Sequence, residues 1–337
     1  MLVFDFLKIM ERRGRLLLAL PLFTILLCDT SILRAEPRRV ELNNGDVYVG
    51  EIENGLRTGT GRYEWNSGYV YEGSYLDDKM SGFGIYTWPD GRTYTGEFLD
   101  DLRHGEGSLQ LPNGDIYTGD FFHNTITGNG RFIWANKDTY TGMFVDGERT
   151  GSGIYRWHTG EEYRGVFHRG ILQGEGVFLW PDGRRYEGQF SDGLKTGTGT
   201  MTWPSGNTYY GYFRDDQREG LGEYMWREGT FYRGFFSGNQ MHGFGVKFTP
   251  ESRLFFQKWD LGELMTDRLI VGIPRCQLSL DGRSWMFIAE TCVNGVAHGR
   301  GHAVRLDGLA FIPNGYFVLG NLVNGETKYL QVMETEE

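Results

Sequence analysis

The chain has 337 residues, a formal net charge of −10 at pH 7, 51 glycines and 15% aromatic residues. This acidic balance argues against a nucleic-acid partner, which requires a basic surface that neutralises phosphates. High glycine with few aromatic residues would indicate disorder, whereas high glycine with this many rings indicates short strands and tight turns.

Residues 1–35 form a leader that lacks the pattern of the rest of the chain. A basic stretch, 12–15, precedes an apolar run, 16–28, and a small residue, Ala35, ends the segment. This order predicts a secretory signal cleaved after Ala35, because the run is shorter than the roughly 20 residues of a membrane span. A signal anchor and a leader without targeting function are the alternatives. A functional signal implies a secreted, periplasmic or endomembrane protein; without one, a cytoplasmic or cytoskeletal location is expected.

Residues 48–254 consist of nine units of 23 residues, with no insertion or deletion between them. Each unit begins with a tyrosine, and glycines follow at +2, +11 and +13 from that tyrosine. The tyrosines are Tyr48, Tyr71, Tyr94, Tyr117, Tyr140, Tyr163, Tyr186, Tyr209 and Tyr232. A fixed period predicts a stacked repeat array, and residues 36–47 are expected to form a half-repeat that caps its start.

Each unit is expected to form a β-hairpin. Tyr186, Gly188 and Phe190 alternate along one strand, positions +13, +15 and +17 alternate along a second, and 191–193 and 204–206 carry turn signals. The glycines at +2 and +13 leave slots in which aromatic rings can lie. The predicted fold is therefore all-β, an elongated single-layer antiparallel sheet of stacked hairpins.

The two faces of this sheet differ along the array. The face that carries the tyrosines (the ring face) is constant, whereas the opposite face, at +1, +3, +14 and +16, is polar in early units and apolar in units eight and nine. The apolar residues there are Tyr210, Tyr212, Met225, Phe235, Val246 and Phe248. A solvated face is not expected to change in this way, so either the carboxy-terminal tail or another chain is expected to cover it.

Residues 255–337 carry weak echoes of the repeat and are expected to form degenerate units or a cap. Phe255, Trp259 and Gly262 occupy the Tyr, Phe and Gly positions of a tenth half-unit, and 294–325 keep part of the glycine spacing. Cys276 and Cys292 are an even pair that would form a disulfide in an oxidising compartment. Two buried thiols in a reducing cytosol are the alternative.

The units resemble MORN (membrane occupation and recognition nexus) repeats. The family pattern of Tyr-x-Gly-x-Phe followed by Trp-Pro-Asp-Gly is met most fully at 71–75 with 87–91, and again at 180–183 with 186–190. Leu111 and Lys137 depart from it. The resemblance implies a scaffold without catalysis that binds protein partners and often self-associates, so a homodimer is one expected state. Its alternative is tethering of a complex at a phospholipid membrane, which the acidic charge disfavours.

On this interpretation, an aromatic groove on the ring face would bind a partner helix or extended peptide. The candidate contact residues are Tyr94, Phe98, Trp134, Tyr155, Trp157, Trp180 and Trp203. The alternative is that these rings form only the core of the sheet itself.

No catalytic residue, metal site or cofactor is predicted. His104, His242 and His298 each precede a glycine, where the family pattern has histidine. Acidic pairs such as 77–78 lie in expected turns and lack the spacing of calcium loops. Residues 255–337 are too few, and carry no motif, for an added catalytic domain.

Overall fold

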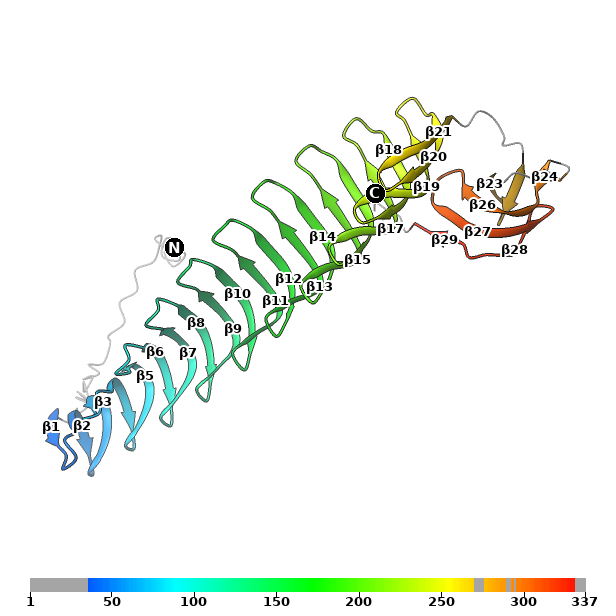
Figure 1. Ribbon diagram of the computed structural model, residues 1–337. Helices are drawn as coiled ribbons and strands as arrows, with labels where there is room; N and C mark the ends of the chain where they lie inside the picture. The colour runs from blue at the N-terminus through cyan, green and yellow to red at the C-terminus, as the bar shows by residue number, and fades with distance from the viewer. Residues whose placement is uncertain (1–35, 270–275, 289–291, 294, 331–337) are drawn as a thin grey trace, which may run out of the picture. The chain divides into compact units, whose positions relative to one another are not determined.

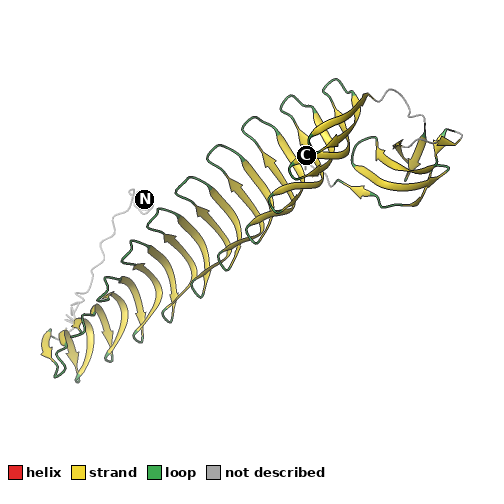
Figure 2. Cartoon of the chain, viewed as in Figure 1, coloured by secondary structure: helices red, strands yellow, loops and turns green. Residues whose placement is uncertain are grey.

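The computed structural model describes residues 36–269, 276–288, 292–293 and 295–330. All regular secondary structure in these ranges is β-strand, arranged in two sheets, and no helix occurs among them. Figure 2 shows this all-strand composition. The leader 1–35, with its predicted signal, lies outside the described residues.

The first sheet is a 21-stranded meander in which each strand is antiparallel to the next in sequence (Figure 1). Its strands are β1 (Arg38–Glu41), β2 (Val47–Glu53), β3 (Leu56–Glu64), β4 (Val70–Leu76), β5 (Lys79–Thr87), β6 (Thr93–Leu99), β7 (Leu102–Gln110), β8 (Ile116–Phe122), β9 (Thr125–Ile133), β10 (Thr139–Val145), β11 (Glu148–Arg156), β12 (Glu162–His168), β13 (Ile171–Leu179), β14 (Arg185–Ser191), β15 (Leu194–Thr202), β16 (Thr208–Arg214), β17 (Gln217–Met225), β18 (Phe231–Ser237), β19 (Gln240–Phe248), β20 (Leu254–Asp260) and β21 (Glu263–Leu269). The predicted array of stacked hairpins is confirmed.

Two kinds of turn join the strands. Within a hairpin, the residues at +6 and +7 both have positive φ, for example 48° at Asp77 and 70° at Asp78, as type I′ turns require. Between hairpins, the amide of Gly68 donates to the carbonyl of Trp65 (2.8 Å), and the amide of Trp65 donates to the carbonyl of Tyr69 (3.0 Å). Both turns lie where the sequence predicted them.

The glycine at +11 forms a β-bulge, a role that the sequence analysis did not assign. Gly142 pairs with Gly153, but Met143 pairs with Thr150, so two residues of β11 are left over at this point. One of them, Gly151, has a φ of 60°. Glycine adopts this conformation without a Cβ penalty, which explains why every unit keeps a glycine there.

The glycines at +2 and +13 make room for the tyrosine ring, as predicted. A Cβ added to Gly142 or Gly153 would lie 2.5 Å from the Tyr140 hydroxyl oxygen. Tyr140 is 0% exposed, and its hydroxyl donates to the carbonyl of Met143 (3.0 Å), next to the bulge. The hydroxyl therefore satisfies a part-buried acceptor, and a phenylalanine would remove this hydrogen bond.

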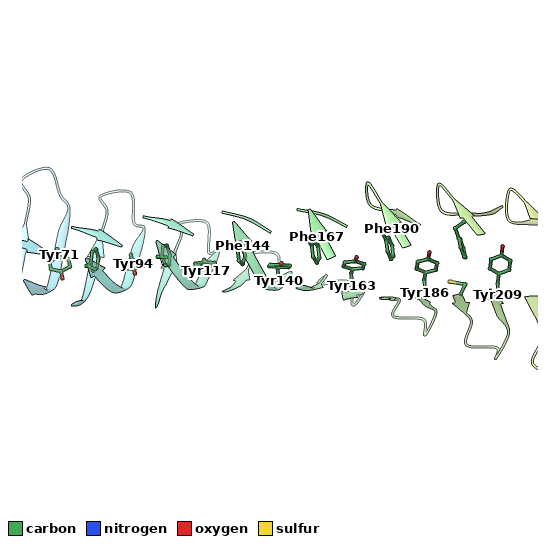
Figure 3. Close-up of a cluster of buried hydrophobic side chains, with 14 of the residues drawn as sticks. Tyr71, Tyr94, Tyr117, Tyr140, Phe144, Tyr163, Phe167, Tyr186, Phe190 and Tyr209 are labelled. Atoms are coloured by element: carbon green, nitrogen blue, oxygen red, sulfur yellow. The ribbon is translucent and has the colours of Figure 1, made fainter. Parts of the chain in front are cut away.

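The core of the array is a row of alternating Tyr and Phe rings (Figure 3). Tyr140 makes a T-shaped contact with Phe144 of its own unit and another with Phe167 of the next unit, with ring centroids 5.1 Å apart in both. The same pair of contacts recurs along the sheet. The core of the array is thus a chain of nearest-neighbour contacts.

The carboxy-terminal end of the first sheet follows the tenth half-unit suggested by the sequence. Trp259 takes the Phe position, with its ring centroid 6.2 Å from that of Tyr232. Gln257 stands at the slot position in place of glycine; it is 1% exposed and donates to Asp267 (3.1 Å). A side chain now fills the slot, so the pattern of ring and glycine ends here.

The second sheet has its own core. Its strands are β22 (Gln277–Leu280), β23 (Arg283–Ile288), β24 (Cys292–Val293), β25 (Val296–Ala297), β26 (Gly299–Arg305), β27 (Ala310–Val318), β28 (Asn321–Asn324) and β29 (Lys328–Tyr329). They follow the order β24-β25-β22-β23-β26-β27-β28, with β29 also on β27 and with β22 parallel to β25. Trp285, Phe287 and Phe317 are buried between them, and a disulfide joins Cys276 to Cys292.

The glycine echoes after residue 294 lie in this second sheet and do not extend the first. Gly301 pairs with Gly315 across β26 and β27. A Cβ on Gly315 would lie 2.4 Å from the Phe317 ring, so a glycine again makes room for an aromatic ring. The local device of the repeat therefore recurs in a sheet of different topology.

Candidate functional site

The seven predicted groove residues fall into two groups. Tyr94 and Phe98 are 0% and 5% exposed and belong to the buried Tyr–Phe row. They offer almost no surface to a partner. The other five, Trp134, Tyr155, Trp157, Trp180 and Trp203, are only partly buried and pack on the solvent side of that row.

Rings at +15 and +17 line up along the ring face; we call this row the ring strip. Its longest uninterrupted run covers units four to six, with successive ring centroids 4.4 to 5.4 Å apart. The run consists of Phe132, Trp134, Tyr155, Trp157, Phe178 and Trp180. Leu109, Leu111 and Met201 interrupt the strip on either side, and Trp203 belongs to a separate run with Tyr224 (5.6 Å).

Cations at +9 lie over these rings, a feature that the sequence analysis missed. The Arg149 guanidinium carbon lies 5.5 Å from the Trp134 ring centroid and 5.0 Å from that of Tyr155. Equivalent contacts involve Arg57, Arg103, Lys195 and Arg218. The remaining units carry Met80, Ile126, Leu172 and Met241 at this position. Aligning the units on their tyrosines would have shown this near-alternation of charged and apolar residues.

Each of these cations is held by the turn of the following unit. Arg103 donates through Nη2 to the carbonyl of Asn124 (2.8 Å), and Arg149 donates through Nη2 to that of Gly170 (3.0 Å). Burial lowers the pKa of the Arg103 guanidinium, which nevertheless stays protonated at neutral pH. The array therefore holds fixed positive charges at its aromatic surface.

A second polar link between successive units is formed by the residue two positions before the tyrosine that begins a unit. The Asp138 carboxylate accepts hydrogen bonds from the Tyr155 hydroxyl (2.8 Å) and from the amide of His158 (2.8 Å). Burial opposes the charged form, but the hydrogen bonds from His158 and Tyr155 prevail and lower the pKa of Asp138 to about 2. This carboxylate orients Tyr155, so the ring strip is held in place from within the array.

On the opposite face, the second sheet packs against units eight and nine. Val246 is 0% exposed in a cluster with Val304 and Phe311 of β26 and β27. The Phe235 ring contacts that of Phe311 (centroids 5.5 Å apart), and Arg233 Nη1 donates to a carbonyl of the second sheet (2.6 Å). Carboxy-terminal residues thus lie on part of the apolar patch.

The predicted patch residues are not all covered. Phe235 and Phe248 pack against the cluster shared with the second sheet. Tyr212 and Met225, by contrast, are 38% and 41% exposed. Tyr210 is half-buried and is not a member of this cluster. The structure therefore brings the unit-nine residues together with the second sheet and leaves most of the unit-eight residues beside it.

Elsewhere on the opposite face there is a surface depression of about 730 Å³ over units two to five, lined mainly by glycine, threonine and polar side chains. Within the described ranges, no group of three or more His, Cys, Asp or Glu residues is placed to hold a metal ion. A search of the same residues for a helix long and apolar enough to cross a membrane finds none.

This geometry defines an all-β repeat protein in which successive hairpins of the same design stack on one another. The family model of the MORN repeat matches nine segments in succession. They are residues 48–68, 71–91, 94–116, 117–139, 140–162, 163–184, 186–208, 209–231 and 232–250. These segments amount to more than half of the sequence, so the chain belongs to the MORN repeat family. Members of this family are repeat scaffolds that are often associated with proteins or membranes.

Three solved structures give partial alignments. The TCP domain of SAS-4 (dCPAP) from Drosophila melanogaster, in complex with a proline-rich motif of Ana2 (dSTIL), aligns at 11% identity over 73% of this chain and 99% of that one, with a TM-score of 0.22. A catalytically inactive virginiamycin B lyase from Staphylococcus aureus with quinupristin aligns at 10% identity over 82% of this chain and 94% of that one, with a TM-score of 0.14. A streptogramin B lyase structure aligns at 9% identity over 76% of this chain and 91% of that one, with a TM-score of 0.15. TM-scores this low do not indicate a common fold. No significant match to a curated protein is found.

Proposed function

We propose that this protein is a non-enzymatic scaffold that binds a protein partner, as a helix or an extended segment, along the ring strip. The observation that carries the proposal is the run of six partly exposed rings from Phe132 to Trp180. The Tyr–Phe row behind these rings already fills the core. The strip packs on this row with part of each ring and leaves the rest of the ring accessible to a partner.

The size and chemistry of the run suit a protein partner. Three units contain six strands, which at strand spacing extend over about 29 Å, the length of a helix of roughly 20 residues. Partly exposed Trp and Tyr held rigidly by their neighbours are the residues that dominate protein interfaces. Asp138 and Arg149, which fix Tyr155 from two sides, lower the entropy lost when a partner docks on it.

The contacts of the histidines support a role without catalysis. The His104 ring packs against those of Phe122 and His123, with centroids 5.3 and 5.4 Å away. His158 Nδ1 lies 2.8 Å from Asp138 in the polar link between units. Ring packing and hydrogen bonding within the array therefore account for the positions of these two rings.

The proposal is tested by exchanging Trp134 and Trp157 for alanine together and comparing the proteins captured from host extract with those captured by the wild type. The matched control exchanges two exposed apolar residues of the opposite face, Phe83 and Val166, for alanine. Loss of partners only in the tryptophan variant supports the proposal. Unchanged partners in a variant whose circular dichroism shows an intact fold would contradict it.

The competing role is attachment to membrane lipid, which the family also includes. Pelleting with vesicles that contain anionic lipid, at low salt, separates the two roles. Tryptophan-dependent pelleting together with no tryptophan-dependent protein capture would favour the lipid role instead.

A further inference from the structure

Three of the five cations at the ring strip have no acidic partner within the described part of the chain. Arg57 and Lys195 form ion pairs with Asp78 (3.0 Å) and Asp216 (2.6 Å) of the following unit. Among the residues that the structure describes, no carboxylate forms an ion pair with the other three cations, which are Arg103, Arg149 and Arg218.

The sequence of the following turn produces this difference. The residue at +7 of the next unit is aspartate beside Arg57 and Lys195, whereas the corresponding residues beside the three unpaired arginines are Asn124, Gly170 and Asn239. These turns contribute carbonyl oxygens, which hold the arginine in place but leave its charge uncompensated. In a chain with a net charge of −10, three such cations at one aromatic surface are unexpected for solvation alone.

The guanidinium groups also retain unused donors. A guanidinium has five N–H bonds. Arg103 uses donors on Nε and Nη2 for Asn124, whereas Arg149 uses Nη2 for Gly170 and a further donor for the Tyr155 hydroxyl. The remaining donors are suited to a carboxylate, which forms charge-assisted hydrogen bonds with arginine.

We propose that the partner of the ring strip is an acidic protein segment, whose Asp or Glu side chains pair with Arg103, Arg149 and Arg218. This inference rests on the proposed function and specifies its partner. Apolar side chains of the same segment pack on the tryptophans and on Ile126 and Leu172, which occupy +9 in the units that lack a cation.

The spacing of the arginines restricts the partner. Arg103 and Arg149 lie two units apart, which corresponds to about 19 Å along the sheet, or about 13 residues of a helix and six of an extended strand. Arg149 and Arg218 lie three units apart. A partner that uses all three therefore carries acidic groups in widely separated clusters, with apolar residues between them.

A peptide suits this surface better than a lipid membrane does. The arginines are half-buried and lie over three or four rings each, where a single side chain can reach them. A flat anionic surface would also meet the carboxylates of a chain with a charge of −10, and repulsion would oppose its approach.

The test is selection of binders from a phage library of random 20-residue peptides on the full chain. The selected peptides are then measured by fluorescence anisotropy against the wild type, R103Q/R149Q and the charge-matched control R131Q/R214Q, whose arginines are exposed. We expect peptides rich in Asp, Glu and large apolar residues. R103Q/R149Q should bind them at least about tenfold more weakly, the control should bind them as the wild type does, and added NaCl should weaken wild-type binding.

The outcomes separate this inference from the proposed function. Peptides that lose binding to the W134A/W157A variant but lack acidic residues, or that bind R103Q/R149Q normally, overturn the acidic partner and leave the ring-strip scaffold intact. An absence of peptides that depend on the tryptophans counts against both. Vesicle binding that is lost in R103Q/R149Q, without acidic peptides, assigns the arginines to lipid and overturns the inference. If R103Q/R149Q unfolds, the R103K/R149K variant and the salt dependence of wild-type binding are measured in its place. Weaker binding of acidic peptides by R103K/R149K and weaker wild-type binding in added NaCl support the acidic partner. Peptides without acidic residues, bound with no dependence on NaCl, overturn the acidic partner.

Discussion

The two sheets of this protein solve the same packing problem in different ways. In the repeat array, each strand pairs only with its neighbours in sequence, and each buried ring contacts its own unit and the next. In the second sheet, β23 pairs with β26 and β22 lies parallel to β25, so strands distant in sequence must meet. Repetition thus stabilises the array, whereas the second sheet depends on non-local contacts and a disulfide.

The two cores also differ in polarity. The nine tyrosines that begin the units are at most 2% exposed, and eight of them donate a hydrogen bond to the backbone three residues on. The core of the second sheet consists of Phe, Trp, Ile, Leu and Ala with Cys276, and its described tyrosines, Tyr316 and Tyr329, are exposed. The stability of the array, and not that of the second sheet, should therefore depend on the ionisation and hydrogen bonding of buried tyrosines.

The largest expected effect is unfolding of the array in alkali. Burial raises the pKa of Tyr94, Tyr140 and Tyr163 from 10 to about 12. Between pH 10 and 12 the unfolded chain releases protons that the folded array retains, so the free energy of unfolding falls as the pH rises. Absorbance at 295 nm should show these tyrosines ionising together with loss of the β circular-dichroism signal. Gradual ionisation with the fold intact would contradict the burial.

The next largest effect is expected from a side chain in a ring slot. Gly142→Val would place its Cβ 2.5 Å from the Tyr140 hydroxyl and 2.7 Å from the Gly153 Cα, so we expect the free energy of unfolding to fall by more than about 4 kcal/mol. The control is Gly147→Ala in a turn, where the Cβ meets nothing within 4 Å and only the φ of 80° opposes it. Thermal unfolding should rank the two. Equal losses would mean that backbone conformation and not space selects the slot glycines.

Removing the disulfide should separate the two sheets energetically. The bond spans 16 residues, and bonds of this size stabilise folded domains by roughly 2–4 kcal/mol. In the Cys276→Ala/Cys292→Ala variant we expect faster hydrogen exchange in residues 277–330 and unchanged exchange in 48–240. Faster exchange throughout the array would show that the sheets unfold as one unit.

The smallest effect tests a single hydroxyl in two contexts. Tyr140→Phe leaves the Met143 carbonyl without its donor and should lower the free energy of unfolding by about 1–3 kcal/mol. Tyr232 is equally buried, but its hydroxyl has no hydrogen-bond partner among the described residues, so Tyr232→Phe should be neutral or slightly stabilising. Chemical denaturation measures both, and equal losses would show that the backbone hydrogen bond contributes nothing.

The array could be predicted from the sequence because its determinants are local. The 23-residue period, the turn residues and the ring-and-glycine alternation each specify a feature within one unit, and the structure has all three. The role of Gly151 in the bulge was not predicted, because a bulge depends on how two strands pair. The spacing of residues within one strand does not show that pairing.

The second sheet and the site were less accessible. The glycines from 295 to 325 suggested further units, but nothing local in the sequence indicates that β22 pairs with β25. At the site, the family pattern pointed to the tryptophans, whereas Arg149 was overlooked because its importance depends on four rings from three units. Exposure was also beyond the sequence, since Tyr94 and Trp134 share a face but only Trp134 remains accessible.

The two terminal strands of the first sheet carry a consequence for solubility. This meander is an open sheet, so among the described residues β1 and β21 each leave one row of backbone groups unpaired, and such rows recruit other chains into fibres. β1 has the sequence Arg-Arg-Val-Glu, and β21 carries Glu263, Asp267 and Arg268 with every residue exposed. These charges discourage pairing with a second copy. A chain cut after β19 would instead end on a strand whose only charged side chain is Lys247, and that edge would no longer be protected against pairing with the same edge of a second copy.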